Sequence, residues 1–305
     1  MMATKGFALI VVLWVVTLLT IMASSFALTI QREATITGGL KEKAQAAALA
    51  EAGINFAILM LLNNDAEQRW KANSSLYEIE FSGKRIRILI ADESGKVSMN
   101  KASKEQLKQL FDSLAVEDEL ADNLSDAILD WRDKNDLQRL NGAEKQDYED
   151  ADLKYSPRDG LFKSVEEVQM VMGMTAEIYS QIEGKISVYT QSKNINPATA
   201  TREVLLTLPD ANESLVDEYL LLRVEAERNG EDAPKPDWFS GNSSSSKVYM
   251  IVAEALIAEN VSEKIMAVMK QGQAQDGAPY KLLKWSENYP MPSLFSPTND
   301  QWVIN

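Results

Sequence analysis

The sequence contains neither cysteine nor histidine in its 305 residues. Disulfides, thiolate nucleophiles and cysteine-rich zinc sites are therefore excluded. Without histidine, the chain also lacks the usual general base of a Ser-His-Asp triad and the common ligand of soft metals. Any metal ion bound by this chain must be a hard cation held by oxygen atoms.

Positive charge is scarce as well. The chain has 31 Lys and Arg against 45 Asp and Glu, which gives a formal net charge of −14. Proteins bind nucleic acid mainly through cationic contacts to phosphates, so this balance argues against a nucleic-acid partner. An acidic surface is compatible with cation binding, and the length allows one large or two modest domains, each with its own core.

Charge is missing altogether from Phe7 to Ile30. As a helix this run would extend about 36 Å, which is enough to cross a bilayer. It is longer than a secretory apolar core of roughly 7–15 residues, and no A-x-A-like site ends it, so removal by ordinary signal peptidase is disfavoured. Lys5 lies just before the run, which places the amino terminus in the cytoplasm and the bulk of the chain across the membrane.

Helical periodicity continues beyond this apolar run. The stretch LKEKAQAAALAEAGINFAILMLL has alanine at seven positions and apolar residues at helical spacing. It predicts one long helix from about Phe7 to Leu62, apolar all round at first and amphipathic afterwards. On these residues alone the alternative stays open: a simple anchor followed by an unrelated soluble helix.

Strand patterns occur at both ends of the remaining chain. Apolar and polar residues alternate in 76–81 and 84–92 around Ser82-Gly83, which predicts a hairpin. Strand-like alternation returns in 247–259, 263–270 and 280–285. We expect an α+β fold in which these strands form one antiparallel sheet, interrupted in sequence by a helical block with a short strand near 185–190.

An internal repeat lies in the helical block. VSMNKASKEQL, which starts at Val97, aligns with INPATATREVL, which starts at Ile195. Ser103 and Thr201 are predicted helix N-caps in the two copies. The repeat resembles SAM-like or helix-hairpin-helix units. Such units often bind DNA phosphates, but the turn at 208–211 lacks glycine and its surroundings are acidic, which favours a structural, protein-facing role.

The segment from Asp112 to Gly160 has 15 acidic and 6 basic residues. It is either a solvated loop or a loop ordered by a divalent cation, with apolar side chains at Trp131, Leu137, Leu140 and Tyr148 for anchoring. Against an EF-hand template that starts at Asp133, the ninth and twelfth places bear oxygen, but leucine occupies the fifth place and glutamine replaces the glycine. The segment is not an EF-hand. A catalytic carboxylate pair is not indicated either, because neighbours on a loop are not thereby opposed across a cleft.

The amino terminus resembles a prepilin-type signal sequence: a short basic leader, Gly6, then Phe7 opening the apolar run. In that family a membrane peptidase cuts after the glycine and the new terminal Phe is methylated, which here implies a cut between Gly6 and Phe7. Most pilin-like proteins carry Glu at the fifth residue after the cut, but here that residue is Val11. The K-type minor pseudopilins of type II secretion systems lack this Glu, and KAQAAALAEAGINFAILMLL is similar to their helix.

The resemblance implies a pilin-like stem helix on a small antiparallel sheet with a large inserted α-helical domain. The expected ranges are a leader at 1–6, a transmembrane helix at 7–30, the stem and first strands at 31–97, the SAM-like insert at 98–240, and the last strands with an irregular carboxyl terminus at 241–305.

The function implied by the resemblance is non-enzymatic: initiation or capping at the tip of a pseudopilus during export across the outer membrane. The protein would cross the inner membrane once, with its globular part periplasmic. Its partners would be the I-type and J-type minor pseudopilins and the prepilin peptidase. The alternative is a membrane-anchored periplasmic binding or adaptor domain that never joins a filament.

The acidic segment matches a stretch, D-W-x-D-x-[DN]-D-x-x-R-x-x-G-A-E-x-x-[DN]-Y, with which K-type pseudopilins bind calcium. The resemblance implies a structural Ca²⁺ here. The preferred side-chain ligands are Asp133, Asn135, Glu144 and Asp147, with Asp130 and Asp136 as further candidates.

Overall fold

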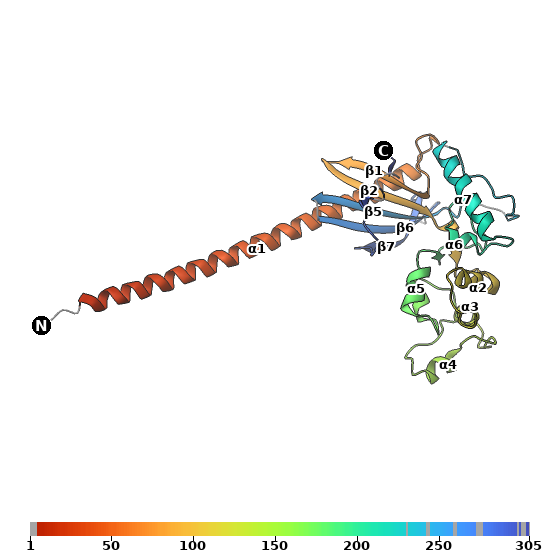
Figure 1. Cartoon of the computed structure of the whole chain (residues 1–305), viewed down its shortest axis with the longest axis horizontal. Helices are drawn as coiled ribbons and strands as arrows, with labels where there is room; N and C mark the ends of the chain where they lie inside the picture. Colours follow the sequence, from red (N-terminus) through yellow and green to blue (C-terminus); the bar gives the residue numbers. More distant parts are fainter. Residues whose placement is uncertain are drawn as a thin grey trace.

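The chain consists of a long rod, a sheet at one end of the rod and a group of helices beyond the sheet (Figure 1). A computed structural model describes residues 5–229, 231–241, 245–258, 261–272, 277–297, 299 and 303–304. The first four residues of the expected leader therefore lie outside the described part of the chain.

The rod is a single helix, α1 (Lys5–Leu61), of 57 residues. This confirms the prediction of one continuous helix. Every residue from Phe7 to Gln45 is exposed, whereas Ala46, Ala50 and Ile54 begin a buried stripe at helical spacing. The helix thus changes from apolar on all sides to apolar on one side where it reaches the sheet. Its first part is long and apolar enough to cross a membrane.

The sheet has six strands in the order β7-β6-β5-β2-β1-β8. All neighbours are antiparallel except β1 and β8, which are parallel. The bounds are β1 (Asn73–Phe81), β2 (Lys84–Asp92), β5 (Val248–Ala258), β6 (Val261–Gln271), β7 (Tyr280–Glu287) and β8 (Val303–Ile304).

The early hairpin and the three late strands are where the sequence predicted them, and β2 pairs directly with β5. At the hairpin turn Ser82 and Gly83 have φ angles of 54° and 70°, as a turn with two left-handed residues requires. The two-residue strand β8 was not expected, because the carboxyl-terminal stretch is too short and too irregular in pattern to show alternation.

Helix α1 covers one face of the sheet. Ile54, Ala57 and Ile58 pack against buried residues of β2, β5 and β6. Gly53 lies at the closest approach: a Cβ atom at this position would come within 2.8 Å of Ile86 Cγ2 and 3.2 Å of Ala253 Cβ. Only glycine therefore lets the helix lie this close to the sheet.

The chain between β2 and β5 is mainly helical. It contains η1 (Glu93–Gly95), β3 (Val97–Ser98), α2 (Lys104–Ser113), α3 (Asp118–Arg132), α4 (Lys145–Asp150), η2 (Glu166–Met170), α5 (Ala176–Ile182), β4 (Ile186–Ser187), α6 (Arg202–Leu205) and α7 (Glu213–Arg228). Strands β3 and β4 pair in parallel as a separate two-stranded sheet. The buried residues of this segment form a cluster distinct from the one beneath α1.

The internal repeat has a structural counterpart in this segment. The side chain of Ser103 accepts a hydrogen bond at the start of α2, and that of Thr201 does so at the start of α6. Arg132 donates to the Met99 and Ala102 carbonyls before α2, and Arg223 donates to the Pro197 and Ala200 carbonyls before α6. Each copy thus has a capped helix whose preceding loop is held by an arginine.

Replacing Gly53 tests the contact between α1 and the sheet. We expect Gly53→Leu to lower the free energy of unfolding by about 1–3 kcal/mol, because the added side chain must displace Ile86 and Ala253. Gly38→Leu is the matched control, since no atom lies within 4 Å of a Cβ added at Gly38. Thermal unfolding of both variants in detergent checks this, and equal effects would contradict it.

Candidate functional site

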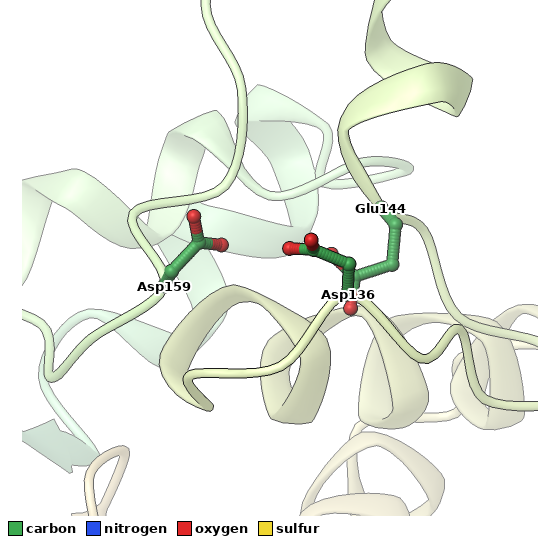
Figure 2. Close-up of side chains that lie close together, drawn as sticks. All are labelled: Asp136, Glu144 and Asp159. Carbon is green, nitrogen blue, oxygen red and sulfur yellow. The ribbon is translucent and has the colours of Figure 1, made fainter.

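The candidate site lies where the loop after α3 and the loop after α4 meet. The carboxylates of Asp136, Glu144 and Asp159 lie close enough for one ion, with one oxygen of each within 4.8 Å of the others. Figure 2 shows Asp159 on one loop with its carboxylate facing those of the other two. Carboxylate oxygens are the ligands that Ca²⁺ prefers.

Glu144 is the buried member of this trio, with 7% of its surface exposed. Its Oε1 atom is buried and has no hydrogen-bond partner among the described residues. Burial, followed by the charges of Asp130, Asp133, Asp159 and Asp136, raises the pKa of Glu144 to about 7. The ionised form of a carboxylate that is shielded from water and surrounded by like charges would be stabilised by a bound cation.

The loop that carries Asp136 is shaped by Arg139. Its guanidinium pairs with Asp130 and lies 2.6 Å from Asp133 Oδ2, and its backbone N–H donates to Asp130 at 3.2 Å. Burial raises the pKa of Asp130 in spite of these bonds. Gly142 passes so close to Asp130 that an added Cβ would lie 1.9 Å from Oδ2. A residue with a Cβ atom at position 142 would therefore have to displace the Asp130 carboxylate.

The loop that carries Asp159 is held by Glu167. This buried carboxylate accepts from Trp131 Nε1 at 3.0 Å and from the Lys163 N–H at 2.9 Å, and it pairs with Arg158. Burial opposes ionisation of Glu167, but these bonds outweigh it and lower its pKa. Asp159 has a φ of 54°, in the left-handed region that aspartate enters more readily than most residues. The turn follows directly after the Arg158 contact.

The structure brings together two of the six predicted ligands, Glu144 and Asp136. The others have contacts of their own. Asp130 and Asp133 pair with Arg139, the Asn135 side chain accepts from the Leu137 N–H at 3.0 Å, and Asp147 accepts from the Glu144 N–H at 2.8 Å. That these four residues also bind the ion stays a prediction.

Asp159 is the site residue that the sequence analysis did not select. It lies within the acidic stretch that was counted, but 15 residues after Glu144 and beyond the matched pattern. Two of the expected apolar anchors are confirmed, since Trp131 and Tyr148 are buried and pack together with ring centroids 5.9 Å apart. The other two were wrong: Leu137 is 78% exposed and Leu140 is 94% exposed, because the loop turns both side chains outward.

Comparisons with known proteins give a consistent picture. Residues 86–191 match the family model "Type II secretion system (T2SS), protein K", and residues 5–55 match the model "PilX N-terminal". A type II secretion system protein K from Aeromonas hydrophila is 26% identical over 229 residues, which cover 66% of this chain and 69% of that protein.

The fold is similar to that of a chain in the crystal structure of the GspK-GspI-GspJ complex from the type 2 secretion system of enterotoxigenic Escherichia coli. The TM-score is 0.56 at 15% identity, and the match covers 82% of this chain and 98% of the other.

The raised pKa of Glu144 predicts a pH dependence in the absence of divalent cations. Since the folded state holds a proton that the unfolded state releases above about pH 4.5, stability should fall as the pH rises towards and through 7. We expect Glu144→Gln to be more stable than the unaltered chain at pH 8, on the order of 1–3 kcal/mol, and similar to it at pH 5.

Chemical unfolding in buffers stripped of divalent cations measures this difference. Glu149→Gln is the control, because Glu149 is exposed on α4 and outside the trio. A stability difference between Glu144→Gln and the unaltered chain that does not change with pH would contradict the prediction.

Proposed function

We propose that this chain, which belongs to the K-type minor pseudopilins of type II secretion systems, acts without catalysis at the tip of a pseudopilus. There it would initiate or cap the filament that exports proteins across the outer membrane. The observation that carries the proposal is the continuity of α1: an uncharged helix fully exposed from Phe7 to Ile30 runs without a break into the helix that supports the sheet.

An exposed apolar helix must be covered by lipid or by other helices. By length and composition the helix fits a single-pass anchor. We propose that it crosses the inner membrane, with the sheet and the helical segment in the periplasm. In a filament the same surface would pack against the stem helices of other subunits. We propose that the prepilin peptidase first cuts between Gly6 and Phe7, so that the helix serves as anchor and then as stem.

Val11 supports the placement at the tip. In pilin-like filaments the Glu at the fifth residue of one subunit faces the amino-terminal ammonium of the subunit ahead. A carboxylate buried without such a partner is costly. A subunit with nothing ahead of it has no ammonium to pair with, so an apolar residue is favoured at this position.

The shape of the head supports the same placement. The helical segment lies at the end of the molecule away from the amino terminus and extends to one side of the rod axis (Figure 1). We propose that it is a domain inserted into the pilin-like sheet between β2 and β5. Such a domain would obstruct stacking of a further subunit above it. The I-type and J-type minor pseudopilins are the proposed partners, in line with the complex to which the fold is similar.

The first test is the mature amino terminus in the bacterium that encodes the chain. Mass spectrometry of the purified protein should find methylated Phe7 as the first residue, and a Gly6→Ala precursor should remain uncut. An intact Met1 would contradict the proposal and favour an anchored adaptor domain that never joins a filament.

The second test is the charge at the fifth position of the mature chain. We expect Val11→Glu to reduce export of secreted proteins several-fold in a strain that lacks the chromosomal copy, because the new carboxylate has no ammonium to pair with. Val11→Leu, which stays apolar, should support normal export. Export that is unchanged by Val11→Glu would contradict the tip placement.

We further propose that the carboxylate trio binds a structural Ca²⁺. Asp136, Glu144 and Asp159 supply carboxylate oxygens, which are the ligands that Ca²⁺ prefers. The buried Glu144 Oε1, which has no hydrogen-bond partner among the described residues, would gain one favourable partner in the cation. The ion would offset the repulsion among the three charges and tie the two loops together. No nucleophile or general base is arranged around the trio in the described residues, so the role is structural.

Calcium should therefore raise the melting temperature of the full chain in detergent, by the equivalent of about 2.7 kcal/mol at a free concentration 100-fold above Kd. Asp159→Asn should weaken binding at least tenfold. The matched control is Asp152→Asn, since Asp152 is exposed, has a similar φ of 55° and lies outside the trio. Calcium titrations that give the same Kd for both variants would contradict the assignment of Asp159.

A further inference from the structure

A cavity lies between the sheet and the helical segment, and none of the three carboxylates of the trio lines it. Its volume is about 190 Å³. The floor is apolar and comes from the sheet, with Met250, Met266 and Val268. Tyr179 and Glu183 come from α5 and the residue that follows it, and Tyr189 and Tyr289 complete the wall. The cavity is smaller than the roughly 300–1,000 Å³ of typical small-molecule pockets, so it suits one side chain or a small ligand.

The charges of the wall are paired except for one. Lys96 lies 2.5 Å from Glu93, and Lys284 pairs with Glu166 across the junction between the sheet and the helical segment. Glu183 has no ion pair among the described residues. The lining thus holds three glutamates against two lysines, and Glu183 is the carboxylate left over.

Three tyrosines, Tyr179, Tyr189 and Tyr289, line the same cavity as this unpaired carboxylate. Tyr179 and Tyr289 share this lining with Glu183, and burial, followed by the negative charge of Glu183, raises the pKa of both tyrosines. Tyr189 is likewise kept neutral by burial and by nearby glutamates. Neutral tyrosine rings beside a carboxylate attract a cation through the ring faces and the charge together.

We propose that this cavity binds an alkylammonium or guanidinium group, with Glu183 as its counter-ion and the tyrosine rings as its walls. The chemistry is that of a lysine or arginine side chain from a protein partner, or of a small free amine. Because the walls come from the sheet and from the helical segment, a bound cation would also brace the two parts against each other. The proposal is independent of the role at the pseudopilus tip.

The test uses the full chain in detergent micelles with ¹³C-methyl-labelled methionine, since Met250 and Met266 report from the floor of the cavity. Ethylguanidinium and n-butylammonium should shift these two signals with a saturable dependence, whereas butyrate and n-butanol should not. Glu183→Gln should weaken binding of both cations at least tenfold, and Glu218→Gln, the same change on an exposed face of α7, should leave it unchanged.

Tyr289→Leu gives a second, independent variant. It should weaken binding of ethylguanidinium several-fold, because it removes an aromatic ring that attracts the cation. The wall of the cavity stays apolar on that side, since leucine replaces tyrosine. Circular dichroism and melting temperatures establish that each variant is folded. The proposal would be overturned if butyrate bound as tightly as the cations. It would also be overturned if Glu183→Gln bound the cations as tightly as the unaltered chain does.

The blocked tripeptide acetyl-Gly-Arg-Gly-amide distinguishes the two sources of the cation. If it binds at least as well as ethylguanidinium, the cavity accepts a side chain presented by a polypeptide. If only the small cations bind, the ligand is a free amine. Either result upholds the cation site, whereas no saturable shift with any of the three cations would overturn it.

Discussion

The pairing of β2 with β5 is the constraint on which the rest of the structure depends. In this register Asp92, the last residue of β2, lies opposite Tyr249 at the start of β5. The chain therefore leaves the sheet and returns to it at the same place, and everything between them must form a unit that closes on itself. The contact of Gly53 with Ile86 of β2 and Ala253 of β5 fixes the rod to these same two strands. The rod and the helical segment are thus both joined to the sheet through the same two strands, β2 and β5.

The carboxylate trio lies within the segment that β2 and β5 enclose, and the end of α3 determines where its loops lie. Asp136 and Asp159 lie on separate loops. Each loop is held by an ion pair between a buried carboxylate and a partly exposed arginine, Asp130 with Arg139 for one and Glu167 with Arg158 for the other. Both Asp130 and Trp131, which donates to Glu167, lie at the end of α3. One helix end therefore holds both loops, and the repulsion among the three carboxylates is not relieved by the loops moving apart.

Much of this could be predicted from the sequence wherever the signal was local. The rod follows from an apolar run that turns amphipathic, and the hairpin from alternation around Ser82-Gly83. Glu144 and Asp136 are among the ligands that the resemblance to K-type pseudopilins implies, through a motif that lies within one stretch of sequence. Asp159 could not be found this way, because its place is set by Glu167 and Trp131, which are distant in sequence. Asp133 and Asn135 stay predicted ligands, and their side-chain oxygens also accept from the backbone N–H groups two residues on, of Asn135 and Leu137. Hydrophobicity alone predicts Leu137 and Leu140 as anchors, but it does not determine whether a side chain on a loop points into the core or into solvent.

The distribution of charge along the chain is compatible with the proposed function. The run from Phe7 to Ile30 has no charge, and the net charge of −14 belongs to the rest of the chain. A subunit with no carboxylate between Phe7 and Ile30 can enter an apolar helix bundle without an ammonium partner, so nothing in this run requires a subunit ahead. The acidic excess lies beyond this run, and much of it falls between Asp112 and Gly160, where 15 acidic residues stand against 6 basic ones. A tip subunit must satisfy two conditions. Its apolar helix must not need the amino-terminal ammonium of a subunit ahead, and its head must block the stacking of a further subunit. In the proposed function, Val11 would meet the first condition and the helical segment beyond the sheet would meet the second.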